Sequence, residues 1–277
     1  MHPLDIHWVY TFGSVALVAG ASLTGMLGLA MSPKRLSQVV PLIVSMAAGA
    51  LLGTAFGHLL PEAIERLGSG LKLSTLLLGS FVTFFVLEKT LGVWLEGDSH
   101  EHAGPHKHSH HEQVTLPPKD VPAAGGRSMI TNLLFGATVH SFIDGMALAT
   151  GYCAGTHLGI VTTVAVLMHE TPHHIGDVSI LIHSGIPVKR AVALSLAAGS
   201  AAAIGALLVL LVGMHSADIT DVLLPFTTAN FLYIASASLL PELQRVRGVR
   251  QSVAQTIFLL FGAFMMLALP IFMSESR

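Results

Sequence analysis

Eight long apolar stretches dominate this sequence and constrain its fold more than any other feature. A helix needs about 20 mostly apolar residues to cross a bilayer. The stretches run roughly over residues 8–31, 40–65, 72–95, 128–152, 157–183, 188–213, 219–241 and 252–273. Backbone polar groups inside a bilayer must be satisfied within each segment, so continuous runs of this length predict helices. The fold class that we predict is an all-α, polytopic membrane protein with eight transmembrane helices.

Composition argues against the main alternatives. Only 11% of the 277 residues are charged, against about 25% in soluble domains, which disfavours a water-soluble enzyme. The single cysteine, Cys153, excludes a disulfide scaffold. The formal net charge of -2 disfavours a nucleic-acid-binding protein, and we expect no nucleic-acid partner.

The placement of lysine and arginine predicts the orientation of the spans, because positive charge accumulates on the cytoplasmic side. The connections after the first, third, fifth and seventh spans hold Lys34, Arg35, Lys107, Lys119, Arg127, Lys189, Arg190, Arg245, Arg247 and Arg250; the opposite side holds Arg66, Lys72 and Arg277. We therefore expect both termini outside. The first span lacks a basic segment before it and a cleavage signal after it, so we expect it to be retained.

The connection between the third and fourth spans, residues 96–126, is polar and rich in histidine. Six of its histidines lie within residues 100–111: His100, His102, His106, His108, His110 and His111. Such a tract is typical of flexible, low-affinity metal binding, although a solvated spacer is the alternative. The chain thus divides into helices 1–3 (residues 1–95), a cytoplasmic His-rich loop (96–126) and helices 4–8 (127–277).

A short pattern occurs twice in the chain. The second span contains His58-Leu-Leu-Pro61-Glu62, and the seventh contains Ser238-Leu-Leu-Pro241-Glu242. These two spans are predicted to run in opposite directions. A shared pattern in oppositely directed spans indicates an inverted repeat, a common arrangement in transporters. We expect spans 1–3 and 6–8 to be the repeats, around central spans 4 and 5.

Ionisable residues within a bilayer are costly and mark function, and here they concentrate in the fourth and fifth spans. In the fourth span, His140 and Asp144 are four residues apart and share a helix face. In the fifth span, the ionisable residues follow one another at offsets of three and four along the helix. They are His169, Glu170, His173, His174 and Asp177.

Imidazole together with carboxylate suits Zn²⁺, Fe²⁺, Mn²⁺ and similar ions, so two such helices facing one another predict a metal site. Buried hydrogen bonds between helices are the alternative explanation, but it does not easily account for four histidines and three acids. Pro172 removes a backbone N–H within the fifth span and is expected to weaken the helix there. His58 is expected to be either a ligand from a third helix or a hydrogen-bonding residue.

At these residues the sequence resembles the ZIP family of divalent metal transporters. The stretches that carry the resemblance are HSFIDG (140–145), HETPHH (169–174), GTAFGHLLPEA (53–63) and FTTANFLYIASASLLPEL (226–243). The resemblance implies a binuclear site between spans 4 and 5 and allows a homodimer. By position, His140, Asp144, His169 and His173 would form the main site. Glu170, with Ser141 and the bridging Asp144, would form the second.

Two positions depart from the pattern of the family. Ser141 stands where the family usually has Asn, which removes an amide oxygen, and His174 stands where it usually has Glu. The departures put tight binding at the second site in doubt. His174 lies on the neighbouring face of the helix, from which it could compensate as a ligand.

Two other functions compete with this interpretation. His169-Glu170-x-x-His173 matches the H-E-x-x-H motif of zinc proteases, so an intramembrane metalloprotease is the alternative. Pro172 inside the motif argues against it, and a single catalytic zinc leaves His140 and Asp144 unexplained. A cation-diffusion exporter would have six spans and a soluble C-terminal domain, which this chain does not match.

The sequence therefore predicts a transporter of divalent metal ions and not an enzyme. We expect uptake of Zn²⁺ into the cytoplasm, with Fe²⁺, Mn²⁺ and Cd²⁺ as further candidates and no cofactor. There is no G-x-x-x-x-G-K-[ST] motif for ATP, so ion gradients are expected to drive transport. The expected location is the lipid bilayer of the plasma membrane, the inner membrane in a bacterium.

Overall fold

The computed structural model describes residues 3–21, 23, 33–96, 123–213, 217–244 and 248–274. Within these ranges the regular elements are all helical and no strand occurs. In the described part of the chain, six helical segments are long and apolar enough to cross a membrane: Gln38–Leu67, Leu71–Thr90, Ile130–Ala154, Val188–Val212, Ile219–Gln244 and Val249–Leu269. The predicted all-helical membrane architecture is confirmed at this level. The histidines of residues 100–111 lie outside the described residues.

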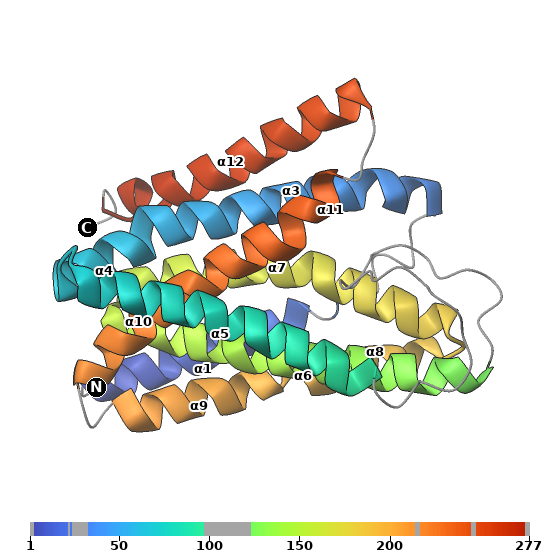
Figure 1. Cartoon of the computed structure of the whole chain (residues 1–277), viewed down its shortest axis with the longest axis horizontal. Helices are drawn as coiled ribbons and strands as arrows, with labels where there is room; N and C mark the ends of the chain where they lie inside the picture. The colour runs from blue at the N-terminus through green and yellow to red at the C-terminus, as the bar shows by residue number, and fades with distance from the viewer. Residues whose placement is uncertain are drawn as a thin grey trace.

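The helices follow the predicted apolar stretches in order (Figure 1). Three stretches are composite: α3 continues through η2 into α4, α10 continues through η4 into α11, and α8 and α9 are separated at Ser200. The bounds are α1 Pro3–Ala21, α3 Pro33–Thr54, η2 Ala55–Leu59, α4 Leu60–Leu67, α5 Leu71–Glu96, α6 Ala123–Ala154, α7 Thr156–His183, α8 Val188–Gly199, α9 Ala201–Gly213, α10 Ala217–Tyr233, η4 Ile234–Leu239, α11 Leu240–Gln244 and α12 Val249–Ser274.

Two of the composite helices contain a short π-helical turn, η2 and η4, and each turn ends at the first leucine of the shared Leu-Leu-Pro-Glu pattern. The N–H of Leu60 donates to the carbonyl of Ala55, and that of Leu240 donates to Ala235, five residues back in each case. A proline ring clashes with the carbonyl four residues before it. The wider turn before Pro61 and Pro241 relieves this clash without ending either helix.

The helix that carries His140 and Asp144, α6, packs very closely against α9. A Cβ added at Gly145 would lie 1.9 Å from the carbonyl oxygen of Ala202, and one added at Gly205 would lie 2.0 Å from that of Phe142. Small residues allow helix backbones in membranes to approach one another in this way. The position of α6 is therefore set by backbone contact with α9.

A second close pair is formed by α3 and α12, which run alongside one another at one edge of the bundle (Figure 1). Gly49 on α3 faces the carbonyl of Leu259, and Gly262 on α12 faces the carbonyl of Met46. By contrast, both α5 and α12 expose several large apolar side chains, among them Leu78, Phe85 and Phe264. These surfaces suit contact with lipid better than with water.

Candidate metal centre

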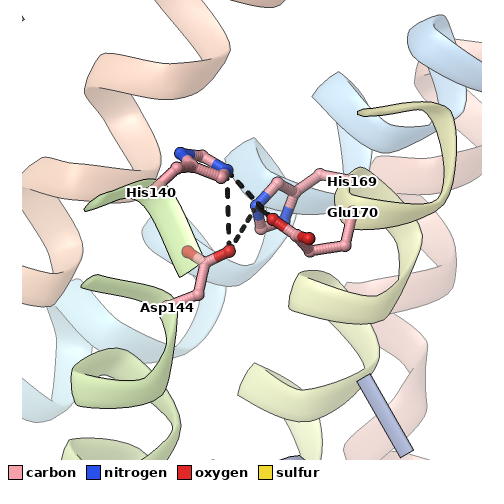
Figure 2. Close-up of side chains that lie close together, drawn as sticks. All are labelled: His140, Asp144, His169 and Glu170. Carbon is pink, nitrogen blue, oxygen red and sulfur yellow. Dashed lines mark hydrogen bonds and ion pairs between the residues drawn. The ribbon is translucent and has the colours of Figure 1, made fainter. Parts of the chain in front are cut away.

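Four ionisable side chains from two helices point toward one another in the interior of the bundle (Figure 2). His140 and Asp144 come from α6, and His169 and Glu170 come from α7, which packs against it. One nitrogen or oxygen atom of each residue lies within 4.8 Å of those of the other three. Among the described residues this is the one group of three or more His, Cys, Asp or Glu side chains that converges so closely.

The distances define a compact set of ligand atoms. Nε2 of His169 lies 3.1 Å from Oδ2 of Asp144 and 3.9 Å from Oε1 of Glu170. Nε2 of His140 lies 3.1 Å from Oε1 of Glu170 and 3.6 Å from Oδ2 of Asp144. Asp144, His169 and Glu170 are buried, whereas the side chain of His140 is 26% exposed. His140 therefore lies at the accessible edge of the group.

The imidazole of His169 is held in an orientation suited to metal binding. Its Nδ1 donates to the carbonyl of Ala165 at 3.2 Å, one turn earlier in α7, and its Nε2 faces Asp144. Histidines that bind metals usually donate their other ring N–H to a carbonyl or carboxylate, which fixes the ring. This contact thus leaves Nε2 directed at the centre of the group.

Two buried carboxylate oxygens are available to bind a metal ion. Oδ1 of Asp144 accepts no hydrogen bond within the described part of the chain, and the close polar neighbour of Oε1 of Glu170 is the imidazole of His140 at 3.1 Å. Burying an uncompensated carboxylate is strongly unfavourable. A divalent cation between the two carboxylates and the two imidazoles would supply the missing charge and ligands.

His174 contacts this group from its outer side. Its Nε2 donates to Oε2 of Glu170 at 2.8 Å, and its Nδ1 lies 3.0 Å from Oγ of Ser195 on α8. The two oxygens of Glu170 therefore face different neighbours, with Oε1 toward His140 and Oε2 toward His174. The sequence pointed to His174 but gave no sign of Ser195, because no local pattern marks a serine on another helix.

The remaining predicted site residues lie at different distances from the group. The ring of His173 is 5.0 Å from that of His140, centroid to centroid, one turn along α7 from His169. Ser141 is buried and lines a small pocket together with Asp144, Glu170 and His174. The other two predicted residues are outside the four-residue group: Asp177, which is buried further along α7, and His58, which is on η2.

His58 instead lies beside His157, a residue that the spacing argument did not select. The ring centroids are 6.0 Å apart, and Nε2 of His58 lies 2.8 Å from the carbonyl oxygen of Met266. Twelve residues separate His157 from His169 on α7, which is about 18 Å along a helix axis. Pro172 does not end α7, which remains helical from Thr156 to His183.

Comparison with known proteins gives the family. The profile of the ZIP zinc transporter family matches residues 7–270. The zinc transporter YKE4 of Saccharomyces cerevisiae is 30% identical over 82% of this chain and 70% of its own length. The mouse zinc transporter SLC39A7 is 29% identical over 94% of this chain and 69% of its own length.

A third relative is matched over less of its own length. The rat zinc transporter ZIP4 is 30% identical over 87% of this chain, which corresponds to 44% of the rat protein. All three relatives are named as zinc transporters. The family therefore argues against the metalloprotease alternative, and the expectation that the chain is not an enzyme is confirmed. This chain belongs to the ZIP zinc transporter family.

Proposed function

We propose that the chain carries Zn²⁺ across a membrane into the cytoplasm through the centre formed by His140, Asp144, His169 and Glu170. The observation that carries the proposal is the convergence of four ligand atoms from α6 and α7 within 4.8 Å of one another. Zinc prefers four ligands drawn from imidazole nitrogen, thiolate and carboxylate oxygen. Fe²⁺, Mn²⁺ and Cd²⁺ are further candidates because imidazole and carboxylate also suit other borderline ions.

The accessible edge of the centre supports a transport role. His140 is partly exposed while the other three ligands are buried, so an ion would reach His140 before the carboxylates. His173, whose ring is 5.0 Å from that of His140, would join the ligand set after a small adjustment of either side chain. A site that exchanges ligands in this way can release its ion as well as bind it.

We propose that the centre holds one ion tightly. His174 already donates to Oε2 of Glu170 at 2.8 Å, so this oxygen is engaged without a second ion. Ser141, the other expected contributor to a second site, offers a neutral hydroxyl. A second ion would have to bind through Ser141 and Oδ1 of Asp144, a weaker set of ligands than the first.

The proposed topology has eight crossings, with both termini outside and residues 96–126 in the cytoplasm between helices 1–3 (1–95) and helices 4–8 (127–277). Its support is the order of the helices and the position of both chain ends at one end of the bundle (Figure 1). The matched π turns η2 and η4 support an inverted repeat of spans 1–3 and 6–8. A cysteine introduced at residue 105 should react with an impermeant maleimide only after the cells are permeabilised.

We place the protein in the plasma membrane, the inner membrane in a bacterium, where such a topology delivers metal to the cytoplasm. The exposed apolar faces of α5 and α12 would contact lipid. A homodimer would cover part of these faces with a second copy.

The test is metal flux in proteoliposomes loaded with a Zn²⁺-sensitive dye. We expect His140→Ala and His169→Ala each to lower the initial rate at least about tenfold, because each removes a ligand. His7→Ala, on α1 and outside the four-residue group, is the matched control and should leave the rate unchanged. Full flux in both ligand variants would refute the proposed centre, and a cytoplasmic zinc sensor in intact cells would report the direction.

A further inference from the structure

A second pair of histidines lies outside the centre, between the second helix and the first turn of α7. His58 is half-buried in η2, and His157 is exposed near the start of α7. Their ring centroids are 6.0 Å apart and their planes meet at 70°. The two side chains come from different helices, so neither sequence spacing nor local structure requires them to meet.

The separation of the two rings matches that of the imidazoles around the main centre. Within the four-residue centre, the centroid distance is 5.4 Å for His140 and His169. The neighbouring ring of His173 lies 5.0 Å from that of His140 and 6.3 Å from that of His169. The 6.0 Å between His58 and His157 falls within this range. The two rings are therefore about as close as those of the main centre, and a cation that binds both would need only side-chain rotation to bring a nitrogen of each toward it.

The ring of His58 is fixed by a hydrogen bond of the kind that supports metal ligands. Its Nε2 donates to the carbonyl of Met266 on α12 at 2.8 Å. That contact leaves Nδ1 with its lone pair available to an ion and holds the ring in place, as carbonyl acceptors do for metal-bound histidines. His58 also lies in a π turn, and such turns occur frequently at functional sites.

The charges beside the pair favour a cation. Arg66 on α4, the helix that follows η2, is engaged by two carboxylates, Glu62 at 2.6 Å and Asp221 at 3.7 Å. It also donates to the carbonyl of Ala154 at 2.9 Å, at the end of α6. Arg66, Glu62 and Asp221 together carry a net charge of about −1. This charge attracts a divalent ion that comes within a Debye length of the group.

The pair lies at the end of the bundle that the proposed topology places outside. Residue 58 precedes the start of α4 by two residues, and α4 lies at the end of the bundle where both chain termini are marked (Figure 1). His157 precedes His169 by twelve residues on the same helix, about 18 Å along its axis. An ion arriving from this side would meet the pair before the centre.

We infer that His58 and His157 form a second, weaker site for a divalent metal ion, at the outer mouth of the pathway. This inference rests on the proposed function, because it assigns the pair to the capture of the transported ion. Two imidazoles leave the remaining positions of the ion to water. A site of this kind exchanges its ion readily, as a position on a transport pathway must.

The test measures bound Zn²⁺ per chain by equilibrium dialysis of the full-length purified protein. The background carries His140→Ala and His169→Ala, and its six histidines in residues 100–111 are replaced by asparagine so that they do not contribute. We expect one weakly bound ion per chain in this background. Adding either His58→Ala or His157→Ala should weaken its binding at least about tenfold, because each removes one of two ligands.

A second readout uses the otherwise unmodified chain. His157→Ala should raise the KM for Zn²⁺ uptake several-fold and leave Vmax unchanged, because His157 is exposed and far from the centre. His7→Ala is the control for both readouts. Equal binding with and without the two substitutions, together with an unchanged KM, would overturn the inference.

The two failures are distinguishable. The proposed function fails when His140→Ala and His169→Ala leave flux unchanged, whatever the binding result at His58 and His157. The inference fails when the residual ion does not depend on the pair, even where flux depends on the centre. Retention of tight binding by His157→Ala in the unmodified chain shows that the variant is folded.

Discussion

The close contact between α6 and α9 predicts an effect of adding a single methyl group at Gly145. Its Cβ would lie 1.9 Å from the carbonyl oxygen of Ala202, whereas real Cβ contacts essentially never fall below 3.0 Å. The two helices must therefore separate by about 1 Å, and overpacking of this kind costs about 1–3 kcal/mol. Alanine offsets part of this loss, because it favours a helix over glycine by about 0.8–1.0 kcal/mol.

The same helix offers a matched control. A Cβ at Gly136 would meet no atom within 4 Å, so Gly136→Ala keeps the gain in helix propensity without the overpacking. Thermal unfolding in detergent should therefore place the Tm of Gly145→Ala below that of Gly136→Ala by about 2–10 °C. Equal values, or a higher Tm for Gly145→Ala, would refute the argument that backbone contact sets the position of α6.

The substitution should also weaken zinc binding. Asp144 precedes Gly145 directly, and its Oδ2 lies 3.1 Å from Nε2 of His169. Binding groups must be held within about 0.5 Å of their working positions, and a displacement of about 1 Å exceeds that tolerance. Calorimetric titration with Zn²⁺ should show the loss in Gly145→Ala and wild-type affinity in Gly136→Ala.

Three further results are expected. His174→Ala removes the donor to Oε2 of Glu170 and should weaken zinc binding about 10- to 100-fold, as loss of a supporting contact does; unchanged affinity in a titration would mean that His174 does not position Glu170. Zinc uptake should fall as the external pH drops below about 6.5, since bound imidazoles must be neutral and protons then compete with the metal; a flat profile down to about pH 5 would contradict a histidine-built centre. Deletion of residues 100–111 should change the apparent affinity for zinc but leave flux measurable, and its complete loss would place the loop on the pathway.

The apolar stretches predicted the helices well, because a bilayer requires long runs of one kind of residue. The predicted span 219–241 lies within α10, η4 and α11, and the predicted span 157–183 matches α7 closely. The sequence did not predict the interruption at Ser200. There the hydroxyl donates to the carbonyl of Ala197 at 2.6 Å, a local bond that competes with the helix.

The candidate centre was predictable in part. Spacing by four placed His140 with Asp144 on one face of a helix, and the structure brings both to Glu170 and His169. Spacing alone did not show that His173, four residues after His169, lies outside the four-residue group although its ring is 5.0 Å from that of His140. It also says nothing about partners on other helices, which is why His157 and Ser195 were not anticipated.

The two π turns have a consequence for the faces of their helices. Each holds one residue more than an α-helical turn would, and one residue corresponds to a rotation of about 100° about the axis. Everything beyond η2 is therefore turned out of phase with α3, so a single helical wheel cannot describe residues 33–67. Removing one residue from Ala55–Leu59 would restore an unbroken α-helix and swing Arg66 away from Asp221. In both halves of the chain, the direction in which the segment after the π turn faces is thus fixed by one extra residue.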